Sequence, residues 1–488
     1  MLYYKNAYEW IFFFRKAASS LAFVLCVFAI SSCFSLADYL TNRYLSSHDV
    51  SGYDLSGADK DLESDSRPDL DACFNFDFDS DSDSGEIADL RKKAWIDYVS
   101  AGRKDKTRRD EFANKSISVN GYVMNYGLRV KGDIKGKKVP VYIALHGGGA
   151  TSFNSFQWQD MADYYYDSIG DGIYVYPRAI EDTYDCHWRP ASFPMYDELI
   201  SNLKLFENRF DASIDLNRVY LLGFSAGGDG VYRISPVMAD RFAAVNMSAG
   251  HPNGVDFSNM RNLPILLQVG QNDSAYNRNK VVAQYDLKLR ELAQKYGGGY
   301  VHEAYIHKGM PHNFNDSSAG GDAVETVIAD PVAWLESDYA RCEYKKVDSS
   351  AGAWVAKYER NPLPEKIVWN LKKNDSRFTS RSVQSFYWLC ADNSVVGGTI
   401  VASYSKASNA VVVESNTVQG DVSILLNDRM MDFSKPITIM TEKGTFEVEP
   451  DINLEVLAET TAERGDPDYQ FLMRVSLAEL EAGAASGV

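Results

Sequence analysis

The sequence has few cysteines and histidines, no long apolar run and no excess of basic residues. Its six cysteines show no CxxC spacing, which argues against a zinc site. The longest apolar run is Leu21–Ile30, whereas a helix that spans a membrane needs about 20 residues. The formal net charge is −17, and nucleic-acid binding requires a basic surface. We therefore expect neither a zinc site nor a nucleic-acid partner.

The N-terminus has the pattern of an export signal. Arg15 and Lys16 precede the apolar run, and two serines and Cys33 follow it, as is typical of a signal peptide. The last residues of this stretch resemble a bacterial lipobox, which implies cleavage before Cys33 and lipidation of that cysteine. We expect residues 1–32 to be removed. The mature chain would then be an exported lipoprotein of the periplasm or cell surface, held on the membrane by acyl chains. An uncleaved signal anchor and an ordinary signal peptide are the alternatives.

An acidic, serine-rich segment follows the signal. Residues 49–89 contain fourteen acidic and two basic residues, which account for most of the net charge. Like charges repel and little apolar material is available for burial, so residues 33–89 are predicted to be a flexible tether. An EF-hand calcium loop that began at Asp79 would need glycine and glutamate where Ser84 and Leu90 stand. The spacing therefore disfavours a calcium site.

Residues 90–348 alternate short apolar runs with segments of helical length. This alternation is typical of a mostly parallel sheet in an α/β domain, with helices on both faces. The expected strands are Val139–Leu145, Gly172–Tyr176, Arg218–Leu222, Phe242–Met247, Leu263–Val269 and Tyr300–Ile306. The expected helices are Tyr196–Phe210, Ala226–Met238 and Asn279–Tyr296. Because active sites of such domains lie at the carboxyl ends of the strands, the residues after each run are candidate site residues.

A glycine-containing motif follows the strand predicted to end at Leu222. Residues Gly223–Gly227 have the G-x-S-x-G spacing of a nucleophile elbow, with Ser225 at its centre. The glycines permit the tight strand-to-helix turn that exposes the serine hydroxyl. Ser225 is therefore the predicted nucleophile. A glycine-rich turn with an incidental serine is the alternative.

A second glycine motif, His146–Gly149, ends the strand predicted at Val139–Leu145. Acyl transfer places negative charge on a carbonyl oxygen, and backbone N–H groups must stabilise that charge. Glycine lets the backbone approach a substrate closely. We expect the N–H groups of Gly147 or Gly148 and of Ala226 to form an oxyanion hole, and the histidine of the motif to be structural.

The other members of a serine-hydrolase triad are expected in the chain order acid, then histidine. Asp273 follows one predicted strand, and His312 lies in the loop after the last one. Of the seven histidines, His312 alone combines this order with a loop position. His312 is thus predicted to be the general base, with Asp273 holding its ring. A helix-capping aspartate and a loop histidine satisfied by backbone are the alternatives.

With these motifs the domain resembles the α/β-hydrolases. Within that superfamily it is similar to polyhydroxybutyrate depolymerase-like and feruloyl-type esterases, and to prolyl-oligopeptidase-like peptidases. The resemblance covers roughly residues 115–345 and rests on Gly223–Gly228, His146–Gly149, Asp273 and His312. It implies a serine hydrolase that needs no cofactor. A small or polymeric ester substrate is favoured because alanine follows the motif serine, where oligopeptidase-like enzymes usually carry a large aromatic residue. A peptidase of the same fold is the alternative.

Three further residues are candidates for lining the pocket. His251 follows a predicted strand, Trp158 belongs to an aromatic cluster after the glycine run, and Trp188 lies in a candidate cover at residues 185–194. Packing in the core is the alternative for the two tryptophans. A catalytically silent, surface-binding lipoprotein is the alternative function from another class, which the presence of every triad residue disfavours.

Residues 349–488 show short apolar runs of period two, which are typical of antiparallel strands in a β-sandwich-like accessory domain. Turns are expected at residues 427–428 and 443–444, and a helix near Leu454–Glu463. Three tryptophans are expected to fill a core or domain interface, with a carbohydrate-binding face as the alternative: Trp354, Trp369 and Trp388. The expected strands are Thr399–Tyr404, Ala410–Glu414, Val422–Leu426 and Pro436–Met440.

Overall fold

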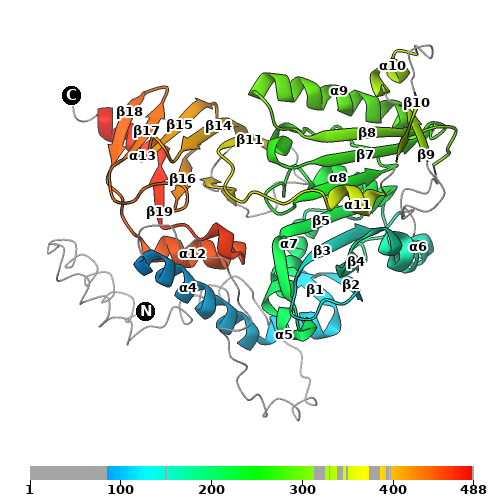
Figure 1. Ribbon diagram of the computed structural model, residues 1–488, viewed down its shortest axis with the longest axis horizontal. Coiled ribbons are helices and arrows are strands. Elements are labelled where there is room, and N and C mark those ends of the chain that lie inside the picture. The colour runs from blue at the N-terminus through cyan, green and yellow to red at the C-terminus, as the bar shows by residue number, and fades with distance from the viewer. Residues whose placement is uncertain are drawn as a thin grey trace, which may run out of the picture.

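The computed structural model describes residues 85–148, 151–312, 325–328, 330–337, 344–347, 350–372, 385–391, 395 and 397–485. The expected signal, the expected lipidation site Cys33 and the expected tether as far as residue 84 lie outside these residues. Figure 1 shows two domains side by side, the larger one built on a twisted sheet and the smaller one formed by the C-terminal part of the chain.

Ten strands form the sheet of the larger domain, in the order β1-β2-β4-β3-β5-β6-β7-β8-β9-β10. Their bounds are β1 Ser116–Val119, β2 Tyr122–Lys131, β3 Lys138–Leu145, β4 Gly172–Pro177, β5 Ser213–Phe224, β6 Ala244–Ser248, β7 Ile265–Gly270, β8 His302–His307, β9 Glu325–Ile328 and β10 Tyr344–Val347. The central six strands, β4 to β8 along the sheet, pair in parallel, and the outer pairings are antiparallel. All six strands expected from the apolar runs are these parallel strands. The fold is therefore the expected α/β-hydrolase fold.

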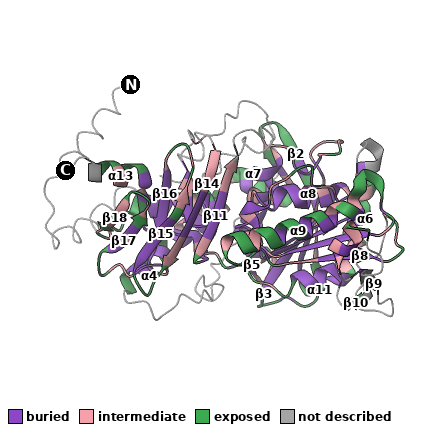
Figure 2. Cartoon of the chain, turned by 90° about the horizontal axis from the view of Figure 1, so that it is seen from above, coloured by how far each residue is buried: buried purple, intermediate pink, exposed green. Residues whose placement is uncertain are grey.

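Helices cover both faces of this sheet. Successive side chains of β3 point to opposite faces, and both sets are buried. Val141 and Ile143 point into the core shared with α7 (Ser192–Leu205), α8 (Ala226–Ile234) and α9 (Arg278–Tyr296). Tyr142 and Ala144 point to the opposite core, beside α6 (Thr151–Tyr164) and α11 (Ala351–Val355). In Figure 2 the sheet is mostly buried, whereas α9 turns an exposed face outward. The three expected helices are present as α7, α8 and α9.

Two sheets form the smaller domain, which agrees with the expected sandwich. One has the order β11-β14-β15-β17-β18 and the other β12-β13-β16-β19, and their buried side chains join one core cluster. Their bounds are β11 Lys366–Lys372, β12 Ser385–Phe386, β13 Leu389–Ala391, β14 Gly397–Ser405, β15 Ala410–Asn416, β16 Val422–Leu426, β17 Ile437–Thr441, β18 Gly444–Val448 and β19 Met473–Ser476. Helices α12 (Leu454–Arg464) and α13 (Leu477–Ala485) complete the domain.

Two details of the smaller domain differ from the sequence-based expectation. The turn at residues 443–444 does join the hairpin β17–β18. Residues 427–428 form no hairpin, because the chain leaves β16 there and crosses to the other sheet. In addition, β15 and β17 pair in parallel, because this crossover returns the chain in the same direction. The period of the apolar residues predicts strands but not which strands become neighbours.

The domain boundaries also differ from the expected ones. Helix α4 begins at Gly85, so the helical part starts within the segment assigned to the tether. Helix α11 lies beyond the boundary at residue 348 but packs on the catalytic sheet, where Trp354 is fully buried. Trp369 and Trp388 are buried in the core as well, which confirms the interpretation of the three tryptophans as packing residues.

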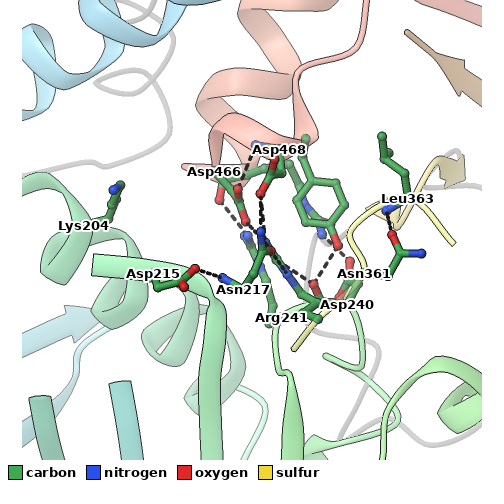
Figure 3. A network of polar contacts seen from close by, with 12 residues as sticks. Lys204, Asp215, Asn217, Asp240, Arg241, Asn361, Leu363, Asp466 and Asp468 are labelled. Carbon is green, nitrogen blue, oxygen red and sulfur yellow. Dashed lines mark hydrogen bonds and ion pairs between the residues drawn. The ribbon is translucent and has the colours of Figure 1, made fainter. Parts of the chain in front are cut away.

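A buried polar network joins the two domains (Figure 3). Arg360, in the connecting segment, contacts the Asp466 carboxylate at 2.7 Å and donates to the Asp240 carbonyl at 3.0 Å. Arg464 pairs with the Asp240 carboxylate, and its own carbonyl accepts from Arg241 at 2.8 Å. These side chains are almost fully buried, so the charges are paired rather than solvated. The C-terminal domain is thus packed firmly against the catalytic domain.

Helix α4 (Gly85–Lys104) reinforces this junction. It runs beside α12, as Figure 1 shows. Arg91 pairs with Asp428 of the smaller domain at 2.9 Å, and its carbonyl accepts from the Gln470 amide at 3.0 Å. On the other side, Trp95 belongs to a cluster with Leu205 at the end of α7. The first described helix therefore contacts both domains.

Candidate active site

Ser225 lies on the sharp turn between β5 and α8. Its backbone has φ 57° and ψ −118°, a strained conformation for a residue with a side chain. The Ser225 N–H donates to the Ser248 carbonyl at 2.9 Å, which ties the turn to β6. A Cβ atom on Gly227 would collide with the Leu145 carbonyl, so glycine is required where α8 passes the end of β3. The turn is built like the nucleophile elbow that the sequence predicts.

Asp273 and His312 lie in two neighbouring loops, after β7 and β8. Hydrogen bonds join these loops: the Asn272 N–H donates to the Met310 carbonyl at 2.8 Å, and the Gly309 N–H donates to the Gln271 side chain at 2.7 Å. Because β7 and β8 are parallel neighbours, both loops leave the same edge of the sheet. The tertiary structure thus brings together residues that are 39 positions apart.

Ser225, His312 and Asp273 form one chain of hydrogen bonds. His312 Nε2 lies 3.0 Å from Ser225 Oγ, and His312 Nδ1 lies 2.7 Å from Asp273 Oδ2. Because an ionised carboxylate can only accept, Nδ1 is the protonated nitrogen of neutral His312 and Nε2 is free to accept from the serine hydroxyl. The Asp273 side chain is 1% exposed, whereas that of His312 is 35% exposed. The arrangement can move a proton from a half-exposed serine to a histidine anchored by a buried acid.

The loop after β3 reaches this chain from the other side. A Cβ atom on Gly147 would lie 3.3 Å from the Ser225 Cβ, so the loop backbone lies against the serine. Gly148 is also described, whereas Gly149 lies outside the described residues. Ala226, whose N–H belongs to the first turn of α8, is buried beside the serine. The backbone of all three predicted oxyanion residues, Gly147, Gly148 and Ala226, is therefore near the strand ends that carry Ser225.

His146 shapes this loop. Its Nε2 accepts from the Ala179 N–H at 3.0 Å, so the ring proton is on Nδ1, which donates to the Gly147 carbonyl at 2.6 Å. Burial lowers the pKa of His146 to about 4, so its ring is neutral at neutral pH. Because a trans peptide points its C=O and N–H in opposite directions, this bond also directs the Gly148 N–H away from the His146 ring. The expectation that His146 is structural agrees with these contacts.

The three candidate pocket residues have different surroundings. His251 is half-buried beside α8, where its backbone N–H donates to the Asp229 carboxylate at 2.6 Å. The Trp158 indole donates to the Tyr176 carbonyl at 2.8 Å and anchors α6 to β4. Trp188 is 4% exposed and packs under the Arg233 guanidinium, 4.5 Å from its ring centre. Trp188 thus belongs to the main core, in agreement with the alternative that it is a packing residue.

Three polar residues near the triad were not anticipated. Gln157, on α6, places its side-chain oxygen against Gly147. Asp229 lies one helical turn after the serine, a spacing that sets it on the same side of α8 and was visible in the sequence. Arg278 contacts the Asp273 carboxylate at 3.4 Å from the start of α9. Nothing in the local sequence distinguishes Arg278 or Gln157 from other surface residues.

Asp229 is a neighbour of this group with a strongly shifted pKa. Burial raises its pKa to about 6, although the His251 N–H, Arg278, the Asn253 amide and His312 all favour its charged form. The carboxylate accepts from the Asn253 amide at 3.2 Å as well as from the His251 N–H. Asp229 therefore fastens the loop after β6 to α8 and contributes a negative potential near the His312 ring above about pH 6.

Neither a metal centre nor a membrane span is found in the part of the chain that the structure describes. No three His, Cys, Asp or Glu side chains of that part are grouped so that they could hold a metal ion. None of its helices combines the length and apolar character needed to cross a membrane. Cys186 and Cys390 are free thiols.

Comparison with known proteins yields weak structural similarity only. No family model matches the chain, and no curated protein does. Similar solved structures include a thermostable esterase (19% identity, 50% of this chain and 62% of that one, TM-score 0.31) and esterase PE8 (16%, 39% and 91%, TM-score 0.29). A candidate dipeptidyl aminopeptidase IV from Bacteroides ovatus ATCC 8483 is also similar (13%, 46% and 34%, TM-score 0.30). The chain thus spans about six tenths of the thermostable esterase. The fold is therefore assigned from the order of the strands in the sheet. The candidate site is assigned from the distances between Ser225, His312 and Asp273.

Proposed function

We propose that the protein is a serine hydrolase that cleaves carboxylic esters through an acyl-enzyme. The observation that carries this proposal is the continuous chain Ser225–His312–Asp273, with bonds of 3.0 and 2.7 Å at the carboxyl ends of parallel strands. A strained backbone at the serine supports it, since such strain is typical of functional positions.

In the proposed reaction, Ser225 Oγ attacks the ester carbonyl while His312 Nε2 takes the hydroxyl proton. The carbonyl oxygen becomes an anion, for which the N–H groups of Ala226 and of Gly147 or Gly148 are the proposed donors. His312 returns the proton to the departing alcohol, which leaves an acyl group on Ser225. A water molecule then attacks the acyl carbonyl while His312 takes one of its protons. The bond between the acyl carbon and Ser225 Oγ breaks, His312 returns the proton to Oγ, and the acid is released. Asp273 stabilises the imidazolium in both steps.

Membrane attachment is a separate part of this proposal. The pattern before Cys33 supports export and lipidation, and an acidic tether of about 50 residues would hold the enzyme away from the membrane surface. The substrate would then be an ester, small or polymeric, that is accessible outside the cytoplasm.

A fluorophosphonate probe tests the catalytic part directly, because it reacts covalently with activated serines. We expect one labelled residue, Ser225, and hydrolysis of short acyl esters by the same preparation. Ser225→Ala should lose labelling and lower ester turnover by at least about 10³-fold, with an unchanged circular dichroism spectrum. Labelling together with cleavage of peptide amides alone would favour a peptidase. Absence of labelling in the folded wild-type protein would refute the proposal.

A further inference from the structure

The Asp273 carboxylate has a partner beyond the triad. Its Oδ2 lies 2.7 Å from His312 Nδ1, while its Oδ1 lies 3.4 Å from Arg278 Nη1. The side chains of Asp273 and Arg278 are 1% and 12% exposed. The Arg278 guanidinium also lies over the Tyr276 ring, 4.9 Å from its centre, and its Nε is buried with no hydrogen-bond partner among the described residues. The two charges are thus largely shielded from water. Coulomb interactions in such a buried environment are stronger than at the surface.

The turn between these residues is specialised. Tyr276 and Asn277 both have positive φ, 56° and 55°, which is unusual for two consecutive residues other than glycine. The Asn279 N–H donates to the Asp273 carbonyl at 3.1 Å, so the backbone of Asp273 accepts a hydrogen bond from the first turn of α9. The strained turn holds Arg278 back against Asp273, and such strain is typical of functional sites.

Charges from several segments act on the His312 ring. Asp273 follows β7, Asp229 belongs to α8, and Arg278 begins α9. The Asp229 carboxylate interacts with both His312 and Arg278, and it also binds the backbone of His251, the histidine of the loop after β6. Two carboxylates therefore place negative charge near the ring, and the Arg278 guanidinium places a positive charge beside both of them.

We propose that Arg278 is a positioning residue that orients Asp273 and keeps the His312 ring unprotonated to lower pH. This inference rests on the proposed function, because it concerns the ability of His312 to accept the Ser225 proton. A protonated ring cannot act as the base, so activity falls as pH decreases. The guanidinium disfavours the imidazolium, which extends activity toward acid. The Arg278 guanidinium also contacts Oδ1 of Asp273, so that Oδ2 of the same carboxylate accepts from His312 Nδ1.

The pH dependence of fluorophosphonate labelling tests this role without knowledge of the natural substrate. In Arg278→Gln, the acid midpoint of the labelling rate should rise by about half a pH unit or more. Arg278→Lys keeps the charge, so its midpoint should lie nearer that of the wild type. Lys280→Gln is the matched control, because it removes an exposed cation two residues further along α9 and should leave the midpoint unchanged.

Two results would overturn the inference. One is a uniform loss of rate in Arg278→Gln with no change in midpoint, which would indicate a structural role only. The other is an equal shift in Lys280→Gln, which would indicate an effect of net charge. If Arg278→Gln does not fold, Arg278→Met keeps the contact with Tyr276 and provides the same neutral comparison. Labelling of the wild type shows separately whether the proposed function holds, so the two failures are distinguishable.

Discussion

Gly147 lies directly against Ser225. A Cβ atom at position 147 would be 3.3 Å from the Ser225 Cβ and 2.8 Å from the Gln157 side-chain oxygen. The Gln157 oxygen ends a flexible side chain that can move aside, whereas the Ser225 Cβ belongs to the strained turn and lies closer than the optimal separation of about 3.5–4.0 Å between non-bonded carbon atoms. A side chain here would push the loop away from the serine, and with it the backbone groups proposed to stabilise the oxyanion.

We therefore expect Gly147→Ala to lower kcat/KM for ester hydrolysis by roughly 10–100-fold, less than the loss of about 10²–10³-fold that follows complete removal of an oxyanion donor. Steady-state kinetics on short acyl esters would measure the loss. Gly170→Ala is a suitable control, because a Cβ there would meet only the Tyr142 hydroxyl at 3.4 Å. Wild-type kinetics in Gly147→Ala would contradict the assignment of this loop.

The interdomain network should dominate the stability of the junction. Arg360→Met would leave the buried Asp466 carboxylate without its 2.7 Å partner, and breaking a buried pair in this way destabilises by about 3–5 kcal/mol. Urea denaturation would measure the free energy of unfolding. Lys106→Met, at an exposed pair on α5 (Lys106–Asn114), should unfold almost as the wild type does. Equal stability of both variants would argue against this role of the network.

Glu111 should make stability depend on pH. Burial, helped by the Glu198 carboxylate, raises its pKa to about 7 from 4.5, so the folded protein favours the protonated form. Its contribution to stability is complete below about pH 4.5 and is lost as pH rises through 7. Glu111→Gln lacks the charge. Its amide oxygen can accept from the Ser118 N–H, and its NH2 group can donate to Asn202 Oδ1 once the Asn202 amide is turned over.

We expect Glu111→Gln to gain stability relative to the wild type as pH rises from 5 to 8. Thermal unfolding at several pH values would measure the difference between the two proteins. Glu86→Gln, at an exposed position of α4, is the control for the loss of one surface charge. A difference that is constant over this range would refute the role assigned to Glu111.

Membrane attachment should depend on Cys33. In the native host, Cys33→Ser should move the protein from the membrane fraction to the soluble exported fraction and abolish incorporation of labelled fatty acid. Ester turnover per molecule should not change, because the substitution leaves the catalytic domain intact. Unchanged membrane association of Cys33→Ser would exclude the lipobox interpretation.

Much of the site could be predicted because the fold places function at strand ends. Ser225 has a local signature, since a G-x-S-x-G turn must follow a strand and start a helix. Asp273 and His312 were found by chain order and by their position after apolar runs. The crossing at residues 427–428 and the attachment of α11 to the catalytic sheet were not predictable, because periodicity shows which face of a strand is buried but not its neighbour.

The sequence alone determined the six parallel strands, three of the helices that pack on them and the types of residue that the chemistry needs, because these depend on local patterns of apolar residues and glycine. Only the tertiary structure decided what surrounds those residues. It placed Arg278 and Asp229 beside the triad, set Trp188 in the core and joined the domains through Arg360. Such contacts depend on how distant segments pack, and the charge and burial that they create are properties of the folded chain rather than of any local stretch.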